Sequence, residues 1–545
     1  MRQAIPENIR HLNRHYEPRH FATRADWLRY ARWLRRHARV SLGLLPEPRR
    51  TPLDARVFGL WKGDGFTCEK VAFESIPGFY VTGNLFRPAG RARRGRAPAI
   101  LCPHGHWEDG RLHDHDPRGS VVARCIRLAQ MGATAFSWDM VGYNDSCQLP
   151  HREFGADAYW GLSLMALQTW NGIRSLDFLL TLAEVDPGRI GVTGASGGGT
   201  QTFVLTAVDG RVAAAAPICM ISYQMQGGCL CENAPLLRID ATSVDLARLF
   251  APKPLFMGSC TRDWTKDTIA EELPAVREVY ALSDAAERVS HLHVDAEHGY
   301  NLQMRESVYG WFNKVLFGAK SAEWLAEGGT SRPPLRDRMV WWGRKRPPEL
   351  PFAALRKIWR RRAEDALRPH LRTPAAARKN LGPLLPHALG VTLTSVDECR
   401  RKRPRGIRVE REGDSLIITP AGRARDVSRL VEFYTAYNRC FVADRVHEIL
   451  AAVEGCPGRT RLVGRGKAGL WCLVAGAISR RVKALDVDVC GFDPSSDAAW
   501  TEHLDVPAIR QVGGLATALA LVGDRPLELR NASPEVRRLA GEFAR

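Results

Sequence analysis

The chain of 545 residues carries a formal net charge of +19 and is 45% hydrophobic, which excludes an intrinsically disordered chain and a small disulfide-stabilised domain. Its basic residues are mostly arginines spread from Arg2 to Arg545, with the densest runs at 356–362 and 400–405. No basic tail and no basic motif with interleaved aromatics stands out, so we expect no nucleic-acid partner.

The sequence contains no pattern typical of a membrane segment. Residues 10–39 are charged and lack the apolar core of a signal peptide, and no apolar run approaches the roughly 18 residues that a membrane helix needs. The 13 cysteines are scattered without a disulfide framework, so we expect reduced thiols. We therefore predict a cytoplasmic protein with no membrane partner, or an exported one if the true start lies upstream. The oligomeric state stays open.

Residues 1–50 predict an N-terminal helical cap. Trp27, Leu28, Trp33 and Leu34 recur at helical spacing, which favours a helix that packs on the next domain.

Residues 51–318 alternate between strand and helix patterns. Strands are predicted at 71–73, 79–86, 99–102, 134–138, 190–193, 212–218, 254–259 and 290–294, the first two as a hairpin. Helices are predicted at 120–131, 161–182, 201–207 and 305–317. Strands that alternate with helices form a mostly parallel sheet covered on both faces, and this order predicts a catalytic domain with the α/β-hydrolase fold.

The central motif is a G-x-S-x-G at 194–198, within R-I-G-V-T-G-A-S-G-G-G-T at 189–200. In a nucleophile elbow the serine lies on a strained turn between strand and helix, and the glycines are needed because a Cβ there would strike a neighbouring element. Ser196 is therefore the candidate nucleophile, and the backbone N–H of Gly197 is a candidate donor to an oxyanion. A plain helix-capping loop is the alternative.

The α/β-hydrolase fold places the acid and the histidine later in the chain, each in a loop after a strand. Asp263 and Asp267 both follow the strand at 254–259, and we favour Asp263 because it lies nearer the strand end. His298 follows the strand at 290–294 and is the candidate general base, with a surface histidine as the alternative.

A second oxyanion donor is expected after the strand at 99–102, where the sequence reads P-H-G-H-W. The backbone N–H of His106 is the candidate. Several ligand-type side chains in this loop could also be drawn as a metal site: His104, His106, His113, His115, Glu108, Asp109, Asp114 and Asp116. Their spacing fits no known metal motif, so we favour a polar active-site loop and predict no metal and no cofactor.

A long insert at 220–245 contains G-G-C-L-C-E-N-A-P at 227–235. Its C-x-C lacks a second pair at metal spacing, so we interpret it as a wall of the substrate pocket, with redox chemistry as the weaker alternative. The candidate pocket residues are His104, Trp107, Cys229, Glu232 and Trp264.

Several stretches together resemble the acetyl xylan esterase-like α/β-hydrolases of bacterial carbohydrate-degrading systems. They are P-H-G-H-W at 103–107, W-D-M-V-G-Y at 138–143, L-Q-T-W-N at 167–171, T-G-A-S-G-G-G-T-Q-T at 193–202, G-G-C-L-C-E-N-A-P at 227–235, D-W-T-K at 263–266 and H-G-Y-N at 298–301. The resemblance covers about residues 55–318. It implies Ser196, Asp263 and His298 as a triad and a carbohydrate ester as substrate, with methyl esters of uronates as a related possibility. The chain departs from many relatives in lacking an evident export signal.

The second half predicts an Arg/Pro-rich helical linker at 319–410 and a smaller domain at 411–545. A G-x-G-x-x-G at 464–469 is typical of dinucleotide binding, but P-G-R at 187–189 recurs at 457–459, a shift of 270 residues. The same shift places Gly194 on Gly464 and Ser196 on Gly466. We therefore interpret this domain as a degenerate, truncated α/β-hydrolase-like copy that has lost its nucleophile and has a structural or pocket-completing role.

These observations favour a serine hydrolase of carboxylic esters that acts through an acyl-enzyme. An acyltransferase or peptidase of the same fold and a uronate methyl esterase are the alternative enzymes. A carbohydrate-binding pseudo-hydrolase is the alternative without catalysis.

Overall fold

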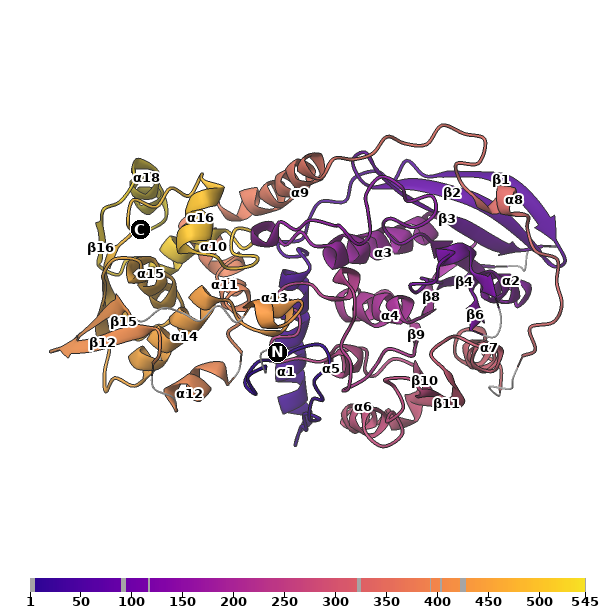
Figure 1. The fold of residues 1–545 in the computed structure, drawn as a ribbon, viewed down its shortest axis with the longest axis horizontal. Coiled ribbons are helices and arrows are strands. Elements are labelled where there is room, and N and C mark those ends of the chain that lie inside the picture. Colours follow the sequence, from indigo (N-terminus) through magenta and orange to yellow (C-terminus); the bar gives the residue numbers. More distant parts are fainter. Residues whose placement is uncertain are drawn as a thin grey trace.

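The computed structural model describes residues 5–89, 95–115, 118–320, 325–392, 394–401, 404–421 and 428–544. The two halves of the chain form two α/β bodies side by side, with helix α1 (Arg24–Ser41) standing between them (Figure 1). Within the described residues, no helix is long and apolar enough to cross a membrane.

The first body is built on a sheet of nine strands among the residues described. These are β1 Arg56–Gly63, β2 Phe66–Ile76, β3 Phe79–Pro88, β4 Ala97–Leu101, β7 Thr134–Trp138, β8 Val185–Ala195, β9 Ala214–Ile218, β10 Leu255–Arg262 and β11 Val289–Glu297. Their order across the sheet is β1-β2-β3-β7-β4-β8-β9-β10-β11. The first three strands and the β3–β7 pair are antiparallel, and every pair from β7 to β11 is parallel.

Helices cover both faces of this sheet. They are α2 Val121–Gln130, α3 Leu164–Thr181, α4 Gly197–Val208, α5 Ser243–Arg248, α6 Glu272–Ala281 and α7 Leu302–Phe317. Side chains of α3 and α4 belong to one apolar cluster and those of α2 and α7 to another, while residues alternate between the clusters along β4 and β9. Strands β7 and β9 are therefore buried at every position, as expected for strands covered on both faces.

The predicted alternation of strands and helices is confirmed, including the hairpin of β2 and β3 and the helices α2, α3 and α7. Sequence patterns missed β1, whose burial is irregular because it lies at the sheet edge. Periodicity failed there because few of its side chains face a core.

The second body has a smaller sheet of five strands within the described part of the chain. These are β12 Ile407–Glu412, β13 Ser415–Pro420, β14 Thr460–Gly464, β15 Val482–Asp488 and β16 Leu527–Arg530, in that order. Strands β13 to β16 are all parallel, as β4, β8, β9 and β10 are. Its helices are α13 Tyr434–Tyr437, α14 Phe441–Glu454, α15 Ala468–Ile478, α16 Asp497–His503, α17 Gly514–Val522 and α18 Pro534–Phe543.

The turn between β14 and α15 holds the glycine motif that the sequence comparison aligned with the elbow. Gly466 has a φ of +54°, close to the φ of 58° at Ser196. A Cβ on Gly469 would lie 1.8 Å from the carbonyl oxygen of Asp488, so this glycine is required for close packing of helix on strand. Both features support a duplicated elbow without a serine.

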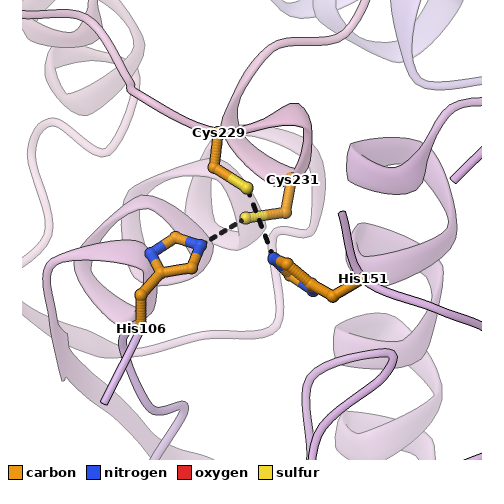
Figure 2. A group of neighbouring side chains, drawn as sticks. All are labelled: His106, His151, Cys229 and Cys231. Carbon is orange, nitrogen blue, oxygen red and sulfur yellow. Dashed lines mark hydrogen bonds between the residues drawn. The ribbon is translucent and has the colours of Figure 1, made fainter. Parts of the chain in front are cut away.

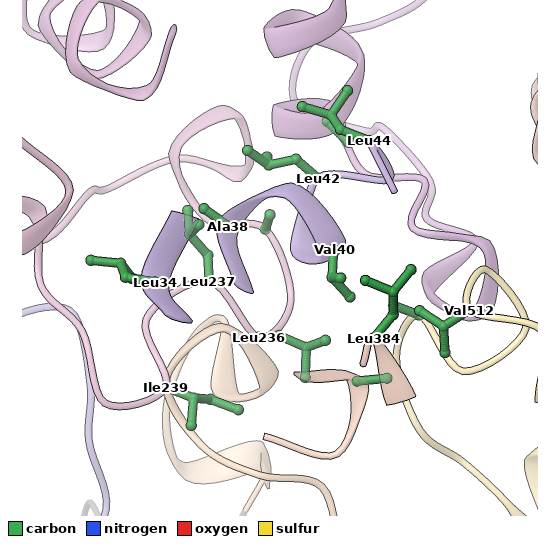
Figure 3. Packing of buried hydrophobic residues seen from close by; sticks show 14 of the residues in the cluster. Leu34, Ala38, Val40, Leu42, Leu44, Leu236, Leu237, Ile239, Leu384 and Val512 are labelled. Atoms are coloured by element: carbon green, nitrogen blue, oxygen red, sulfur yellow. The ribbon is translucent and has the colours of Figure 1, made fainter. Parts of the chain in front are cut away.

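Helix α1 joins the two bodies through one continuous apolar core (Figure 3). Its Leu34 packs in the same cluster as Leu237 of the first body, and Leu384 and Val512 of the second half belong to that cluster too. Because burying one such side chain contributes about 1.5–3 kcal/mol, this shared core binds the halves together.

The segment between the two bodies is helical and touches both of them. It contains α8 Leu335–Arg338, α9 Phe352–Leu367, α10 Pro374–Asn380, α11 Leu385–Ala388 and α12 Ser395–Arg400. On α9, the Trp359 indole N–H donates to the carbonyl of Trp160 at 2.9 Å. Arg360 on the same helix pairs with Asp157 of the first body at 2.5 Å and with Asp497 of the second at 2.7 Å.

Stability should depend on pH through the buried histidine His447, which lies in α14. One ring nitrogen bonds the Ala443 carbonyl at 2.8 Å and the other the Ser395 hydroxyl at 3.1 Å, and burial lowers its pKa to about 3. In the unfolded chain this imidazole binds a proton near pH 6.5, whereas in the folded chain it stays neutral until about pH 3. The free energy of unfolding therefore decreases as the pH falls from 6.5 toward 3.

We expect His447→Gln to flatten the dependence of the unfolding free energy on pH between pH 6 and 4 by up to about 1.4 kcal/mol per pH unit. Urea titrations at several pH values measure this slope. His370→Gln, at a partly exposed histidine in the turn that follows α9, is the matched control. Equal slopes for wild type and His447→Gln would contradict the prediction.

Candidate functional site

Ser196 lies at the turn between β8 and α4 in a backbone conformation that side chains rarely adopt, with φ 58° and ψ −127°. Its N–H donates to the carbonyl of Ile218 at 3.1 Å. A Cβ on Gly194 or on Gly198 would lie 2.5 Å or 2.6 Å from the carbonyl oxygen of Pro103. The close packing thus requires glycine at both positions, and the strained turn places the serine just past the end of β8.

The loop after β4 lies against this turn. A Cβ on Gly105 would lie 2.7 Å from the Ala195 carbonyl oxygen and 2.9 Å from the Cβ of Ser196. Likewise, a Cβ on Gly197 would lie 3.0 Å from Nδ1 of His106. Gly105 and the imidazole of His106 therefore lie against the turn that carries Ser196.

His104 holds this loop from behind. Its side chain is fully buried, Nδ1 bonds the Gly105 carbonyl at 2.7 Å, and Nε2 accepts from the Met140 N–H at 2.9 Å. Burial lowers its pKa to about 3, so the ring is neutral and both nitrogens have fixed roles. Both ring nitrogens bond backbone groups and the ring packs edge-on against Tyr143, so the side chain positions the loop.

Asp263 and His298 come together at the ends of β10 and β11. His298 Nδ1 lies 3.2 Å from a carboxylate oxygen of Asp263, whose side chain is fully buried. The same carboxylate accepts from the Trp264 N–H at 2.7 Å and from the Thr265 hydroxyl at 2.6 Å. Asp267 instead accepts from the Gln224 amide at 3.3 Å.

His298 lies beside the cavity that Ser196 lines. Its ring packs on Trp264 with centroids 4.2 Å apart, and Trp264 lines the cavity together with Ser196. On the other side, the Trp107 ring lies 6.1 Å from the His298 ring. A Cβ on Gly105 would contact both this indole and Ser196, so Trp107 lies near the serine as well as near the histidine.

Cys219 lies within 4.8 Å of the interacting atoms of Asp263 and His298. Its thiol lies 3.3 Å from the Cys260 sulfur, and this contact together with burial raises its pKa well above the usual range. It is therefore a neutral thiol that packs under the histidine loop.

The cavity has a volume of about 660 Å³, within the range of small-molecule sites. Its lining residues are His106, His151, Arg152, Ser196, Met225, Gly228, Cys229, Leu230, Glu232, Trp264, Glu432 and Phe433. Of the predicted pocket residues, Cys229, Glu232 and Trp264 line it. Trp107 instead stacks on His113 with centroids 5.2 Å apart.

Residues of the second half line part of this cavity, at positions that no sequence pattern marked. Besides Glu432 and Phe433 in the lining, the Tyr437 hydroxyl donates to the Asn233 side chain at 2.7 Å. The N–H groups of Leu236 and Arg238 donate to carbonyls of 435 and 436 at 2.7 and 2.8 Å. The insert at 220–245 is therefore bonded by residues of the second half as well as of the first.

A cluster of two imidazoles and two thiols forms one wall of the cavity (Figure 2). His106 Nε2 lies 3.1 Å from the Cys231 sulfur, and His151 Nε2 lies 3.3 Å from the Cys229 sulfur. Hydrogen bonds from Cys231 and then from the two imidazoles lower the pKa of the Cys229 thiol to about 2, against the opposing effect of burial. His151 carried no sequence signal, because it is 78 residues from Cys229.

The described histidines and acids of the loop at 104–116 do not form one cluster of potential metal ligands. Among the described residues, only His106 of this loop belongs to a group of three or more potential ligands. Asp114 instead pairs with Arg332 at 3.1 Å. The side chain of His115 and all of Asp116 lie outside the described residues.

A buried ion-pair group fixes the position of this loop. Arg111 pairs with Asp139 at 2.9 Å and also with Asp145, and all three side chains are fully buried. Asp145 in turn accepts from the Val340 N–H at 2.7 Å, which attaches the segment after the first body. Loss of one partner from such a group typically costs about 3–5 kcal/mol, so the active-site loops and this segment depend on one another.

The fold is similar to those of solved esterases. A methylesterase, BT1017, is 28% identical, with a TM-score of 0.53 and alignment over 64% of this chain and 77% of its own. An acetyl xylan esterase from Paenibacillus sp. R4 is 18% identical over 55% of this chain and 98% of its own, with a TM-score of 0.38. A glucuronoyl esterase from Solibacter usitatus is 16% identical over 50% and 88%, with a TM-score of 0.39.

No protein-family model matches the sequence, and no curated protein matches it. Together with the sheet order and the turn at Ser196, the similarity to the methylesterase confirms the predicted α/β-hydrolase fold and the resemblance to esterases of that fold.

Close packing of the loop on the turn should make Gly105 intolerant of a side chain. We expect Gly105→Ala to lower the free energy of unfolding by about 1–3 kcal/mol, because the new methyl group must displace the Ala195 carbonyl or the Ser196 side chain. Gly228→Ala, where a Cβ meets nothing within 4 Å, is the control in the same cavity. Denaturant titration of both variants measures the difference, and equal stability would argue against the contact.

Proposed function

We propose that this chain is a serine hydrolase of carboxylic esters and that its substrate is a carbohydrate ester. Three observations support the proposal: Ser196 lies on a strained turn, His298 packs on a tryptophan that lines the same cavity as Ser196, and the buried Asp263 carboxylate lies 3.2 Å from the histidine. Similarity to the methylesterase supports ester chemistry on this fold.

Each group has a defined part in the proposed reaction. His298 removes the hydroxyl proton of Ser196 as that oxygen attacks the ester carbonyl, and then returns the proton to the departing alcohol. Asp263 holds the imidazole by its Nδ1 and stabilises the imidazolium that forms. A water molecule then gives a proton to His298 as it attacks the acyl carbonyl, the bond to the Ser196 oxygen breaks, and His298 returns the proton to that oxygen as the acid leaves.

Two backbone N–H groups would stabilise the tetrahedral oxyanion. Gly197 begins α4 behind the serine, and His106 lies in the loop that packs on the same turn. Such preorganised donors contribute about 3–4 kcal/mol each to the transition state. The buried ring of His104 would keep the second donor in place.

A carboxylic methyl ester of a sugar acid is the second candidate substrate beside an acetylated sugar. The similarity to a protein named a methylesterase favours it. The cavity also presents Arg152, a cation that could pair with a neighbouring free carboxylate in an acidic polysaccharide.

A fluorophosphonate probe should label Ser196 covalently, because the probe is attacked only by an activated serine hydroxyl. We expect complete loss of label in Ser196→Ala and full label in Ser283→Ala, measured by intact-protein mass spectrometry. A wild-type chain that takes no label would favour the carbohydrate-binding pseudo-hydrolase instead.

Asp263→Asn should lower kcat by roughly 10⁴-fold with folding intact, because the imidazole would lose the tautomer and charge stabilisation that the carboxylate provides. Turnover of acetylated sugars and of uronate methyl esters measures the effect and separates the two substrate classes. Asp267→Asn is the matched control four residues along the same loop. A large loss in Asp267→Asn with none in Asp263→Asn would reassign the acid.

A further inference from the structure

We propose that His106, His151, Cys229 and Cys231 bind one zinc ion at the wall of the cavity. Each residue offers one ligand atom, and these four atoms all lie within 4.8 Å of one another (Figure 2). Two thiolates and two imidazoles are the donor set of a structural zinc site, and this set does not suit magnesium or calcium.

The spacing of the donor atoms fits a tetrahedral ion. Zinc–sulfur and zinc–nitrogen bonds place a sulfur and a nitrogen about 3.6 Å apart across a tetrahedral edge. The two nitrogen–sulfur pairs lie at 3.1 and 3.3 Å, so small outward movements of the side chains admit the ion. The imidazole centroids lie 5.3 Å apart with the rings steeply inclined, so both can direct Nε2 at one point.

The surroundings orient the ligands for coordination. His151 Nδ1 donates to the Val141 carbonyl at 2.7 Å, which fixes the tautomer with an unprotonated Nε2. The Asn233 amide donates to the carbonyls of Gly227 and Cys229 at 2.9 Å and holds the turn that brings the two thiols together. Gly227 has a φ of +140°, which a residue with a side chain would rarely adopt at this turn.

Charge balance favours the divalent ion. Zinc binding leaves both sulfurs deprotonated, and two thiolates with one divalent ion give a neutral site. Cys231 is 3% exposed and His151 is 8% exposed, so a neutral site suits their burial. Because His106, His151 and Cys229 line the cavity, the cavity provides a path for the ion to enter.

The ion would connect three segments that are distant in sequence: the loop after β4, the segment that follows β7, and the insert. Four protein ligands leave no open position, so its role is structural rather than Lewis-acid catalysis. It would hold the ring of His106, whose backbone N–H is the proposed oxyanion donor, against the first turn of α4. This consequence for catalysis rests on the proposed function, whereas binding of the ion does not.

Metal analysis of the full-length chain tests the proposal. We expect about one zinc per chain after purification or after loading with zinc sulfate, and loss of that zinc in the double variant Cys229→Ser/Cys231→Ser and in His151→Ala. Cys456→Ser and His20→Ala are the matched controls and should keep it. Substitution by cobalt should give the visible absorption of a tetrahedral cobalt–thiolate site in the wild type and not in the double variant.

Thermal unfolding of the wild type tests the site even if the double variant fails to fold. A strong chelator should lower the melting temperature of the wild type and of Cys456→Ser, and zinc should restore it. Zinc retained by the double variant, a wild type that binds none after loading, or a Cys229–Cys231 disulfide in the native chain would each overturn the site. Zinc binding without fluorophosphonate labelling would overturn the proposed hydrolase and keep the zinc site, whereas labelling without zinc would do the reverse.

Discussion

The structure of the candidate site depends on the close approach of three backbone segments at Ser196. The serine has a positive φ, which costs on the order of 1–3 kcal/mol and persists only where the surroundings enforce it. Gly194 and Gly198 allow the Pro103 carbonyl to approach, and a Cβ on Gly199 would lie 2.8 Å from the Ile218 carbonyl. The strained turn therefore fixes both the Ser196 hydroxyl and the loop that flanks it.

The second body contributes to the site through packing rather than through catalytic groups. Its elbow equivalent carries Gly466 where the first body carries Ser196, so this turn keeps the backbone shape without a nucleophile. Residues 432–437 nevertheless line the cavity and bond the insert, and α1 places side chains of both halves in one core. The second half of the chain thus forms part of the cavity wall.

Two histidines of one loop have different surroundings. The imidazole of His106 lies against the first turn of α4 and also meets the thiol of Cys231. His104, two residues earlier, is fully buried and bonds backbone groups. The two imidazoles thus have different roles, because their burial and their bonding partners differ.

The sequence by itself determined the order of strands and helices, the elbow, and the identities of Ser196, Asp263 and His298 as candidates. These follow from local rules, because periodicity, glycine spacing and position after a strand are all readable along the chain. Only the tertiary structure brought His151 to Cys229, placed 432–437 over the cavity, and turned His104 away from it. Such contacts join residues tens to hundreds of positions apart, and their distances depend on how whole layers pack rather than on any pattern within one segment.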